Sequence, residues 1–173
     1  MTEARHVVLI GLMGSGKSTV GRVLAAHLGC PFIDNDVRLE ERTGQTAREV
    51  AAAEGVDALH VREAAVLVDA LASSVPAVVA AAAAAPMEAS AAAAMHAHAV
   101  VYLCTTPEVL AGRIGRTAVG DDHRPFVAGD ALAQLSAQFA ERDPRYRALA
   151  MFVVDAARPS EVIVAEISAA LAR

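Results

Sequence analysis

The chain has 173 residues and a formal net charge of −5. This suits one domain with a sizeable core and argues against nucleic acid as a partner, because a phosphate backbone requires a basic face. Hydrophobic residues make up 55% of the chain and aromatic residues only 3%, so the core must consist mainly of Val, Leu, Ile and Ala. No apolar stretch reaches the ~18 residues that a membrane span requires, and the N-terminus lacks a signal-peptide pattern. We therefore expect a cytoplasmic protein with no membrane partner.

Apolar segments alternate with helical patterns along the chain. Strands are predicted at residues 6–10, 31–34, 76–80, 99–105 and 151–155. Helices are predicted at residues 17–29, 36–44, 46–55, 56–74, 107–116, 131–150 and 159–173. Pro144 is expected to interrupt the helix at 131–150, and Thr46 and Glu49 have the spacing of a capping box. Strands separated by helices of this length predict a parallel sheet with helices on both faces.

A glycine-rich motif, GLMGSGKST at residues 11–19, follows the first predicted strand and opens the first predicted helix. It matches G-x-x-x-x-G-K-[ST] in the structural context that the motif requires. Glycines let the backbone approach phosphates, and N–H groups at a helix N-terminus face an anion. Lys17 is expected to reach the β- and γ-phosphates, and Ser18 to ligate Mg²⁺. The motif thus predicts a nucleoside triphosphate site formed by Gly14, Ser15, Gly16, Lys17, Ser18 and Thr19.

Two acids, Asp34 and Asp36, stand at the end of the second predicted strand. Ligands of doubly wound sheets bind beyond the carboxyl ends of the strands, so both acids should face the crevice that holds the phosphates. One could hold Mg²⁺ through water, and the other could accept a proton from an attacking hydroxyl. The alternative for Asp36 is a structural role as the cap of the next helix.

A polar, glycine-containing loop at residues 117–130 carries Arg124. A mobile lid with an arginine is a common device for neutralising a phosphoryl group in transfer. On the loop's residues alone, a solvated arginine is the simpler interpretation.

The order of the motifs resembles the shikimate kinase family nearly from end to end. The glycine-rich loop is followed by D-x-D at 34–36, E-x-R-T-G at 40–44, R-P at 124–125 and E-R-x-P-x-Y-R at 141–147. The resemblance implies an α/β fold, a three-layer α/β/α P-loop NTPase with a five-stranded parallel sheet, and one kinase domain over residues 1–173. It places a lid at about 115–127 and a small acceptor-binding helical region at about 35–62.

The family's activity is phosphorylation of a ring hydroxyl on a small-molecule acceptor, with ATP and Mg²⁺, and we expect a monomer or weak oligomer. By position, Lys17, Asp36 and Arg124 resemble the catalytic residues, with Asp36 binding acceptor hydroxyls and serving as base. Ser18 and Asp34 resemble the metal-binding pair.

The remaining positions concern the two ligands. Arg113 and Pro159 resemble residues that flank the adenine, and Arg142 resembles an arginine that grips the acceptor carboxylate. The family pattern E-x-x-F-R supplies a second such arginine, but here Leu59 and His60 take the places of Phe and Arg. An unperturbed His is mostly neutral near pH 7 and offers no bidentate fork.

A second departure lies at the end of the third strand. Family members have three glycines against the acceptor ring, where this chain has Ala81, Ala82 and Ala83. Their methyl groups would intrude on the acceptor, and alanine would be strained wherever φ is positive.

Three functions remain open on these residues. The chain is a shikimate kinase with an unusual pocket, a kinase of the same fold for a non-shikimate acceptor, or a catalytically inactive nucleotide-binding homologue. Lys17, Asp34, Asp36 and Arg124 argue against inactivity. Loss of one of two carboxylate-binding arginines costs roughly 2–5 kcal/mol of binding, which by itself favours a different hydroxylated acceptor.

Overall fold

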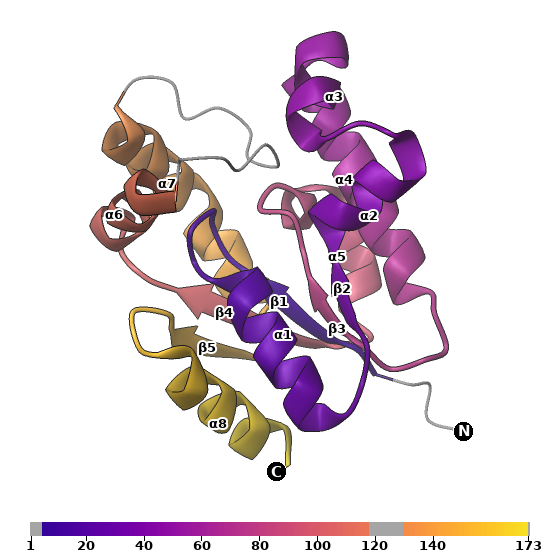
Figure 1. Cartoon of the computed structure of the whole chain (residues 1–173), viewed down its shortest axis with the longest axis vertical. Helices are drawn as coiled ribbons and strands as arrows, with labels where there is room; N and C mark the ends of the chain where they lie inside the picture. Colours follow the sequence, from indigo (N-terminus) through magenta and orange to yellow (C-terminus); the bar gives the residue numbers. More distant parts are fainter. Residues whose placement is uncertain (1–4, 118–129, 173) are drawn as a thin grey trace.

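The computed structural model describes residues 5–117 and 130–172, and the side chains of 115–117 lie outside that description. Its centre is a five-stranded sheet in which every pairing is parallel, in the order β2-β3-β1-β4-β5 (Figure 1). The strands are β1 Val7–Ile10, β2 Phe32–Asp34, β3 Val78–Ala80, β4 Ala99–Cys104 and β5 Phe152–Asp155. The predicted five-stranded parallel α/β fold is confirmed.

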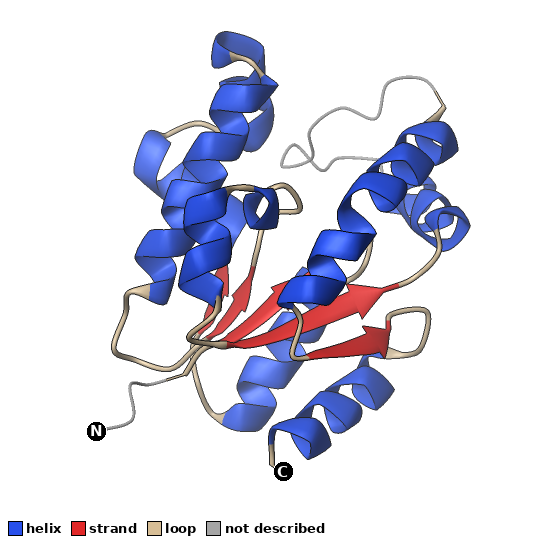
Figure 2. Ribbon diagram, turned by 180° about the vertical axis from the view of Figure 1, so that it is seen from behind, coloured by secondary structure: helices blue, strands red, loops and turns tan. Residues whose placement is uncertain are grey.

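Helices connect the strands and cover both faces of the sheet (Figure 2). They are α1 Lys17–Leu28, α2 Asn35–Thr43, α3 Ala47–Glu54, α4 Val56–Leu71, α5 Ala89–Met95, α6 Pro107–Thr117, α7 Ala131–Leu149 and α8 Ser160–Leu171, with a short 3₁₀ turn at Ala85–Met87. Apolar side chains of α1 and α8 pack on one face, and those of α4, α5, α6 and α7 pack on the other. The result is the predicted three-layer architecture.

Strand register explains why both faces are apolar. Val8 pairs with Val79 on one side and with Val100 on the other, and all three belong to the core beneath α4 and α7. Leu9 and Val101 are the next paired row, and they belong to the core beneath α1 and α8. Because side chains alternate along a strand, a continuous run of aliphatic residues fills both cores of a parallel sheet.

Helix α7 differs from the prediction, because it runs through Pro144 without interruption. A proline inside a helix lacks the N–H that would bond to the preceding turn, at a cost of about 3 kcal/mol. Burial offsets that cost here: Leu135 and Tyr146, on either side of the proline, are 1% and 0% exposed in the main core. Asp130 caps the start of the helix by accepting N–H groups of its first turn.

Helices α2, α3 and α4 enclose a small core of their own, which is formed by Leu39, Ala47, Val50, Leu59 and Val66. The predicted capping box is confirmed: the Thr46 hydroxyl accepts from the Glu49 N–H, and the Glu49 carboxylate accepts from the Thr46 N–H. This core gives the three helices a defined arrangement beside the carboxyl ends of the strands.

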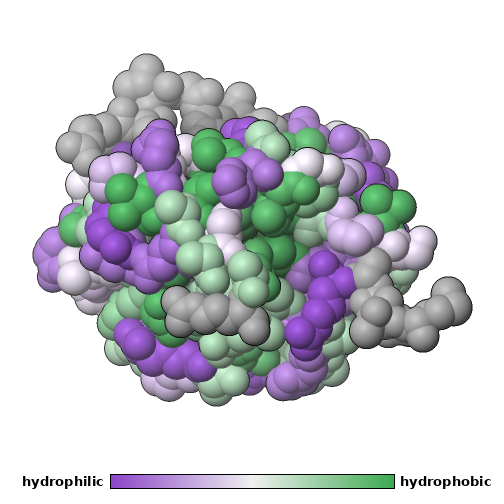
Figure 3. Space-filling view, turned by 90° about the horizontal axis from the view of Figure 1, so that it is seen from below, coloured by the Kyte–Doolittle hydropathy of each residue, from purple (hydrophilic) through white to green (hydrophobic). Residues whose placement is uncertain are grey.

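Figure 3 shows the molecule from below the view of Figure 1, where α3 lies at the opposite, upper end. Hydrophilic and hydrophobic residues are interspersed on the face seen in Figure 3, as is usual for a protein surface that faces water. Within the described ranges, none of the helices has the length and apolar character needed to cross a bilayer.

Candidate active site

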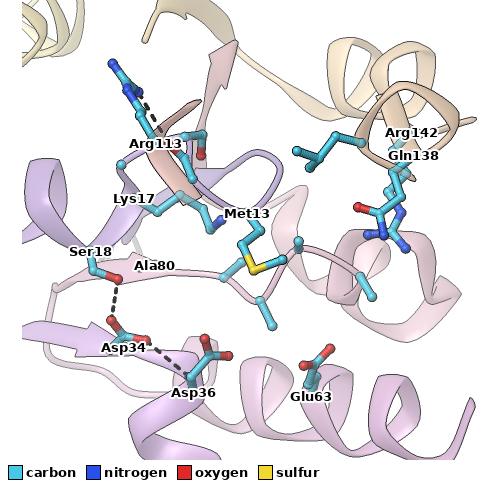
Figure 4. A pocket seen from close by; sticks show the side chains of 18 of the residues that line it. Met13, Lys17, Ser18, Asp34, Asp36, Glu63, Ala80, Arg113, Gln138 and Arg142 are labelled. Carbon is cyan, nitrogen blue, oxygen red and sulfur yellow. Dashed lines mark hydrogen bonds between the residues drawn. The ribbon is translucent and has the colours of Figure 1, made fainter. Parts of the chain in front are cut away.

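A cavity of about 1070 Å³ lies at the carboxyl ends of the strands. It is bounded by the loop before α1, the end of β3, and helices α3, α4 and α7 (Figures 1 and 4). The predicted ligand-binding residues that line it are Gly14, Ser15, Gly16, Lys17, Ser18, Thr19, Asp34, Asp36, His60, Ala81, Ala82, Ala83, Arg113 and Arg142. The fold therefore brings together residues from six separate segments at one edge of the sheet, as expected for an α/β fold.

The loop between β1 and α1 is shaped by backbone constraints. Gly14 and Gly16 have positive φ angles of 82° and 93°, a region that L side chains rarely adopt. Gly11 also approaches the sheet closely, since a Cβ there would lie 2.7 Å from the Leu103 carbonyl oxygen. The Lys17 ammonium donates to the carbonyl oxygens of Gly11 and Leu12 at 2.9 and 3.1 Å. The loop is thus closed on itself, with the N-terminus of α1 directed toward the cavity.

Asp34 joins the glycine-rich loop to α2. The Ser18 hydroxyl donates to Asp34 Oδ2 at 2.6 Å, and the Asp36 N–H donates to Asp34 Oδ1 at 3.2 Å. Asp34 is therefore the N-cap of α2, and Asp36 lies in its first turn. The capping role considered for Asp36 belongs to Asp34 instead, which leaves the Asp36 carboxylate on the cavity wall (Figure 4).

Opposite the loop, Glu63 and Arg142 are two buried charged side chains, 5% and 9% exposed. Arg142 projects from α7 toward the cavity beside Gln138, and Glu63 projects from α4 (Figure 4). Burial raises the pKa of Glu63 to about 8, and the nearby Asp36 carboxylate adds to this, while Arg142 and Lys17 oppose it. Glu63 is therefore mostly protonated at neutral pH. Among the described residues, Arg142 Nε has no hydrogen-bond partner.

His60 is half-buried on the same wall. Burial lowers its pKa, and the positive charge of Arg142 lowers it further, against smaller opposite contributions from three acidic side chains. A neutral imidazole is the expected form at pH 7. This environment is consistent with the prediction that His60 does not provide a second positive charge for the acceptor carboxylate.

The alanines at the end of β3 form the floor of the cavity. No non-glycine residue of the described ranges has a positive φ, so the strain considered for alanine at this place is absent. Ala81 and Ala82 are 1% and 5% exposed and also belong to the main core. The Tyr146 hydroxyl donates to the Ala83 carbonyl oxygen, and Arg145 Nε donates to the Pro86 carbonyl oxygen. This segment is therefore attached to α7.

At the other end of the cavity, Arg113 holds two loops together. Its guanidinium donates to the Gly14 carbonyl at 3.3 Å and to the Ala156 carbonyl at 2.7 Å. Pro159 is the residue before α8 and, within the described chain, does not line the cavity, although Arg158 and Ser160 on either side do. Arg124, the predicted lid arginine, lies outside the described residues.

Glu63 and Arg48 also line the cavity and were not predicted from the sequence. Glu63 had a usable signal: it lies four residues after Leu59 and four before Leu67, on the apolar face of α4. A carboxyl on such a face is either paired or functional. Arg48 had no comparable signal, because an exposed arginine on a short helix is ordinary.

Comparison with known proteins agrees with this geometry. A family model described as "Shikimate kinase" matches residues 13–172. Shikimate kinases of Thiobacillus denitrificans and Thermobifida fusca are each 37% identical to the chain, over 162 residues (92% of this chain, 86% of the relative) and 169 residues (98% and 95%).

The structure of shikimate kinase from Acinetobacter baumannii in complex with shikimate superposes with a TM-score of 0.89 at 28% identity, covering 98% of this chain and 94% of that one. The family match, the identity and the coverage all extend over nearly the whole chain. The chain belongs to the shikimate kinase family.

Proposed function

We propose that the chain transfers the γ-phosphoryl group of ATP to a hydroxyl of shikimate. The observation that carries the proposal is the arrangement of one cavity: Lys17, Ser18, Asp34 and Asp36 lie together at one end, and the buried Arg142 faces them from the other. Family membership indicates shikimate as the acceptor, because the relatives are shikimate kinases and the solved relative was determined in complex with shikimate. The extent of the family match outweighs the departure at His60, so we propose shikimate over a different acceptor or an inactive protein.

The nucleotide is proposed to bind at the N-terminus of α1. There the backbone N–H groups of residues 14–19 meet the phosphates, and Lys17 exchanges its contacts with Gly11 and Leu12 for the β- and γ-phosphates. Arg113, held by the Gly14 and Ala156 carbonyls, is proposed to border the adenine. Arg124 is proposed to reach the transferring group from the lid, and Pro159 to border the adenine with Arg113.

Ser18 and Asp34 fit a Mg²⁺ ion that accompanies ATP. Their side-chain oxygens are 2.6 Å apart, and both are the hard oxygen ligands that Mg²⁺ prefers when it is shared with substrate phosphates. When bound, the metal would neutralise charge on the β- and γ-phosphates. Asp34 is held by the Asp36 N–H for this purpose.

Asp36 is proposed as the residue that receives the proton of the acceptor hydroxyl. The hydroxyl oxygen forms a bond to the γ-phosphorus, the bond between that phosphorus and the β–γ bridging oxygen breaks, and ADP leaves. Asp36 lies on the wall between the Ser18–Asp34 pair and Glu63 (Figure 4), so an acceptor placed over Ala81–Ala83 would lie within its reach. Arg142 at the far end is proposed to bind the acceptor carboxylate.

The test is ADP release in a coupled assay, with shikimate compared against cyclitols, sugars and nucleosides, and with the phosphate ester identified by mass spectrometry. We expect kcat/KM to be highest for shikimate. The rate of ADP release without an acceptor should be far below the rate with shikimate. A rate with shikimate no higher than the substrate-free rate would contradict the proposed acceptor.

We also propose that the whole chain acts as a single kinase domain, in the cytoplasm, as a monomer or weak oligomer. One continuous sheet organises both ends of the cavity, and a net charge of −5 gives no reason to expect nucleic acid. Light scattering on the purified protein, with and without ATP, measures the oligomeric state.

A further inference from the structure

Five lysine and arginine side chains of the described chain line the cavity: Lys17, Arg48, Arg113, Arg142 and Arg158. Three of them belong to the nucleotide end. Lys17 and Arg113 contact carbonyls of the glycine-rich loop, and Arg158 is ion-paired with Glu166 on α8. The other two, Arg48 on α3 and Arg142 on α7, come from the helices that face each other across the acceptor end (Figure 1).

Arg142 is a buried arginine at the acceptor end that keeps one hydrogen-bond donor without a partner among the described residues. The residue is 9% exposed, and the unpartnered donor is its Nε. Glu63 is the buried carboxyl on the facing wall, but burial raises its pKa to about 8, so it is mostly neutral at pH 7. A buried charge is stable only when it is paired, which points to an anionic group on the acceptor.

His60 does not add a second positive charge, because burial and Arg142 both lower its pKa. A single arginine would then hold a carboxylate that can accept several hydrogen bonds. Another guanidinium on this cavity would complete the set.

Arg48 is placed to provide it. The packing of Ala47 and Val50 against Leu59 fixes which face of α3 is buried. Arg48 lies three and four residues before Ala51 and Ala52, on the face of α3 that borders the cavity. Ala51 and Ala52 line the same cavity and carry only methyl side chains. The Arg48 side chain is exposed at this wall, so it can turn inward without breaking the core.

We propose that Arg48 is a specificity-determining residue, which binds the carboxylate of the acceptor from α3 while Arg142 binds it from α7. This inference rests on the proposed function and deepens it. It also gives a physical reason why His60 is tolerated: the second guanidinium comes from a different helix.

The test measures calorimetric affinity for shikimate in the wild-type protein and in the variants Arg48→Ala and Arg48→Lys. Arg48→Ala should weaken shikimate binding by about tenfold to a hundredfold, as expected for loss of a charge-assisted contact. Arg48→Lys should recover only part of the loss, since an ammonium lacks the planar fork. Shikimate methyl ester has nearly the same shape as shikimate but lacks the negative charge. Arg48→Ala should therefore change the affinity for the ester by less than about threefold.

Arg62→Ala is the matched control. Arg62 is an exposed arginine on the neighbouring helix α4, paired with Glu54 and not part of the cavity lining within the described chain. It should leave shikimate affinity within about twofold of wild type. The affinity for ATP should be unchanged in all of these variants.

The outcomes separate this inference from the proposed function. Suppose that the wild-type protein phosphorylates shikimate. If Arg48→Ala then binds shikimate with normal affinity, or loses affinity for shikimate and for its methyl ester equally, the role of Arg48 is refuted and the function stands. If shikimate binds without being phosphorylated, the function fails, and the Arg48 variants still decide the inference by affinity. No binding of shikimate to the wild-type protein overturns both.

Discussion

The two ends of the cavity are constructed differently. At the nucleotide end, short-range backbone geometry positions the chemistry: glycines with positive φ, a helix N-terminus and the Ser18–Asp34 hydrogen bond. At the acceptor end, side chains from three helices carry it: Glu63 is a buried carboxyl with a raised pKa, and Nε of the buried Arg142 has no hydrogen-bond partner among the described residues. An end determined by the backbone tolerates little change in sequence. Where side chains determine the site, a charged residue on one helix can take the place of one on another helix, as we propose for Arg48.

Asp36→Asn should have the largest effect on kcat, because Asp36 is proposed to act where the nucleotide end and the acceptor end of the cavity adjoin. Loss of the proton acceptor is expected to lower kcat by roughly 10²–10⁴-fold, while ATP affinity stays near wild type, because Asp34 and Ser18 are unchanged. Single-turnover kinetics and calorimetry measure the two quantities. Near-normal kcat would remove Asp36 from the chemistry.

Lys17→Ala should come next and tests the nucleotide end alone. Removing the ammonium is expected to lower kcat by roughly 10²–10³-fold, since it stabilises charge on the transferring phosphoryl group. Shikimate affinity in the absence of nucleotide should not change, which is measured by calorimetry. A parallel loss of shikimate affinity would mean that the two ends are not separable.

The same difference decides what could be predicted from the sequence. The glycine-rich loop, Asp34 and Asp36 were found because each is defined by neighbours a few residues away. The strands were found because runs such as 7–10 and 99–104 are apolar without interruption. Arg48 was not found, since its place opposite Arg142, 94 residues later in the chain, depends on how α3 packs on α4.

The error at Pro144 has the same origin. Local propensity predicts a break, but burial of Leu135 and Tyr146 in the core outweighs one lost hydrogen bond. Likewise, the concern that alanine is strained at 81–83 assumed a backbone conformation, which the sequence does not specify; the observed φ angles are not positive.

Glu63→Gln should have an intermediate effect, on stability, and tests the incomplete compensation at the acceptor end. The folded pKa of about 8 lies above the ordinary carboxyl pKa of 4.5, so the native state binds more protons between these values and stability falls as pH rises through that window. The amide cannot ionise. The variant should therefore be more stable than wild type by roughly 1–3 kcal/mol near pH 8.

Urea unfolding at pH 4.5 and pH 8 measures this difference, which should nearly vanish at the lower pH. Asp69→Asn is a suitable control, because Asp69 lies on the same helix but forms an exposed ion pair with Arg42. Equal stability of Glu63→Gln and wild type at pH 8 would mean that Glu63 is already compensated.

Tyr146→Phe should have the smallest effect and concerns the attachment of the cavity floor to α7. The Tyr146 ring is fully buried, and burial raises the pKa of its hydroxyl to about 12, so it remains a donor to the Ala83 carbonyl throughout the working pH range. Its removal leaves that carbonyl without this partner and should cost about 1 kcal/mol of stability. A looser floor should also raise KM for the acceptor by about two- to threefold, with KM for ATP unchanged.

Tyr102→Phe provides the matched comparison, because Tyr102 packs edge-to-face on Tyr146 with ring centroids 5.1 Å apart. Its hydroxyl donates to Asp143, and it does not line the cavity within the described residues. Thermal unfolding should show similar losses for both variants, whereas only Tyr146→Phe should change the acceptor KM. If both variants raise that KM equally, the effect comes from general loosening of α7, and the hydrogen bond to Ala83 has no special part in positioning the acceptor.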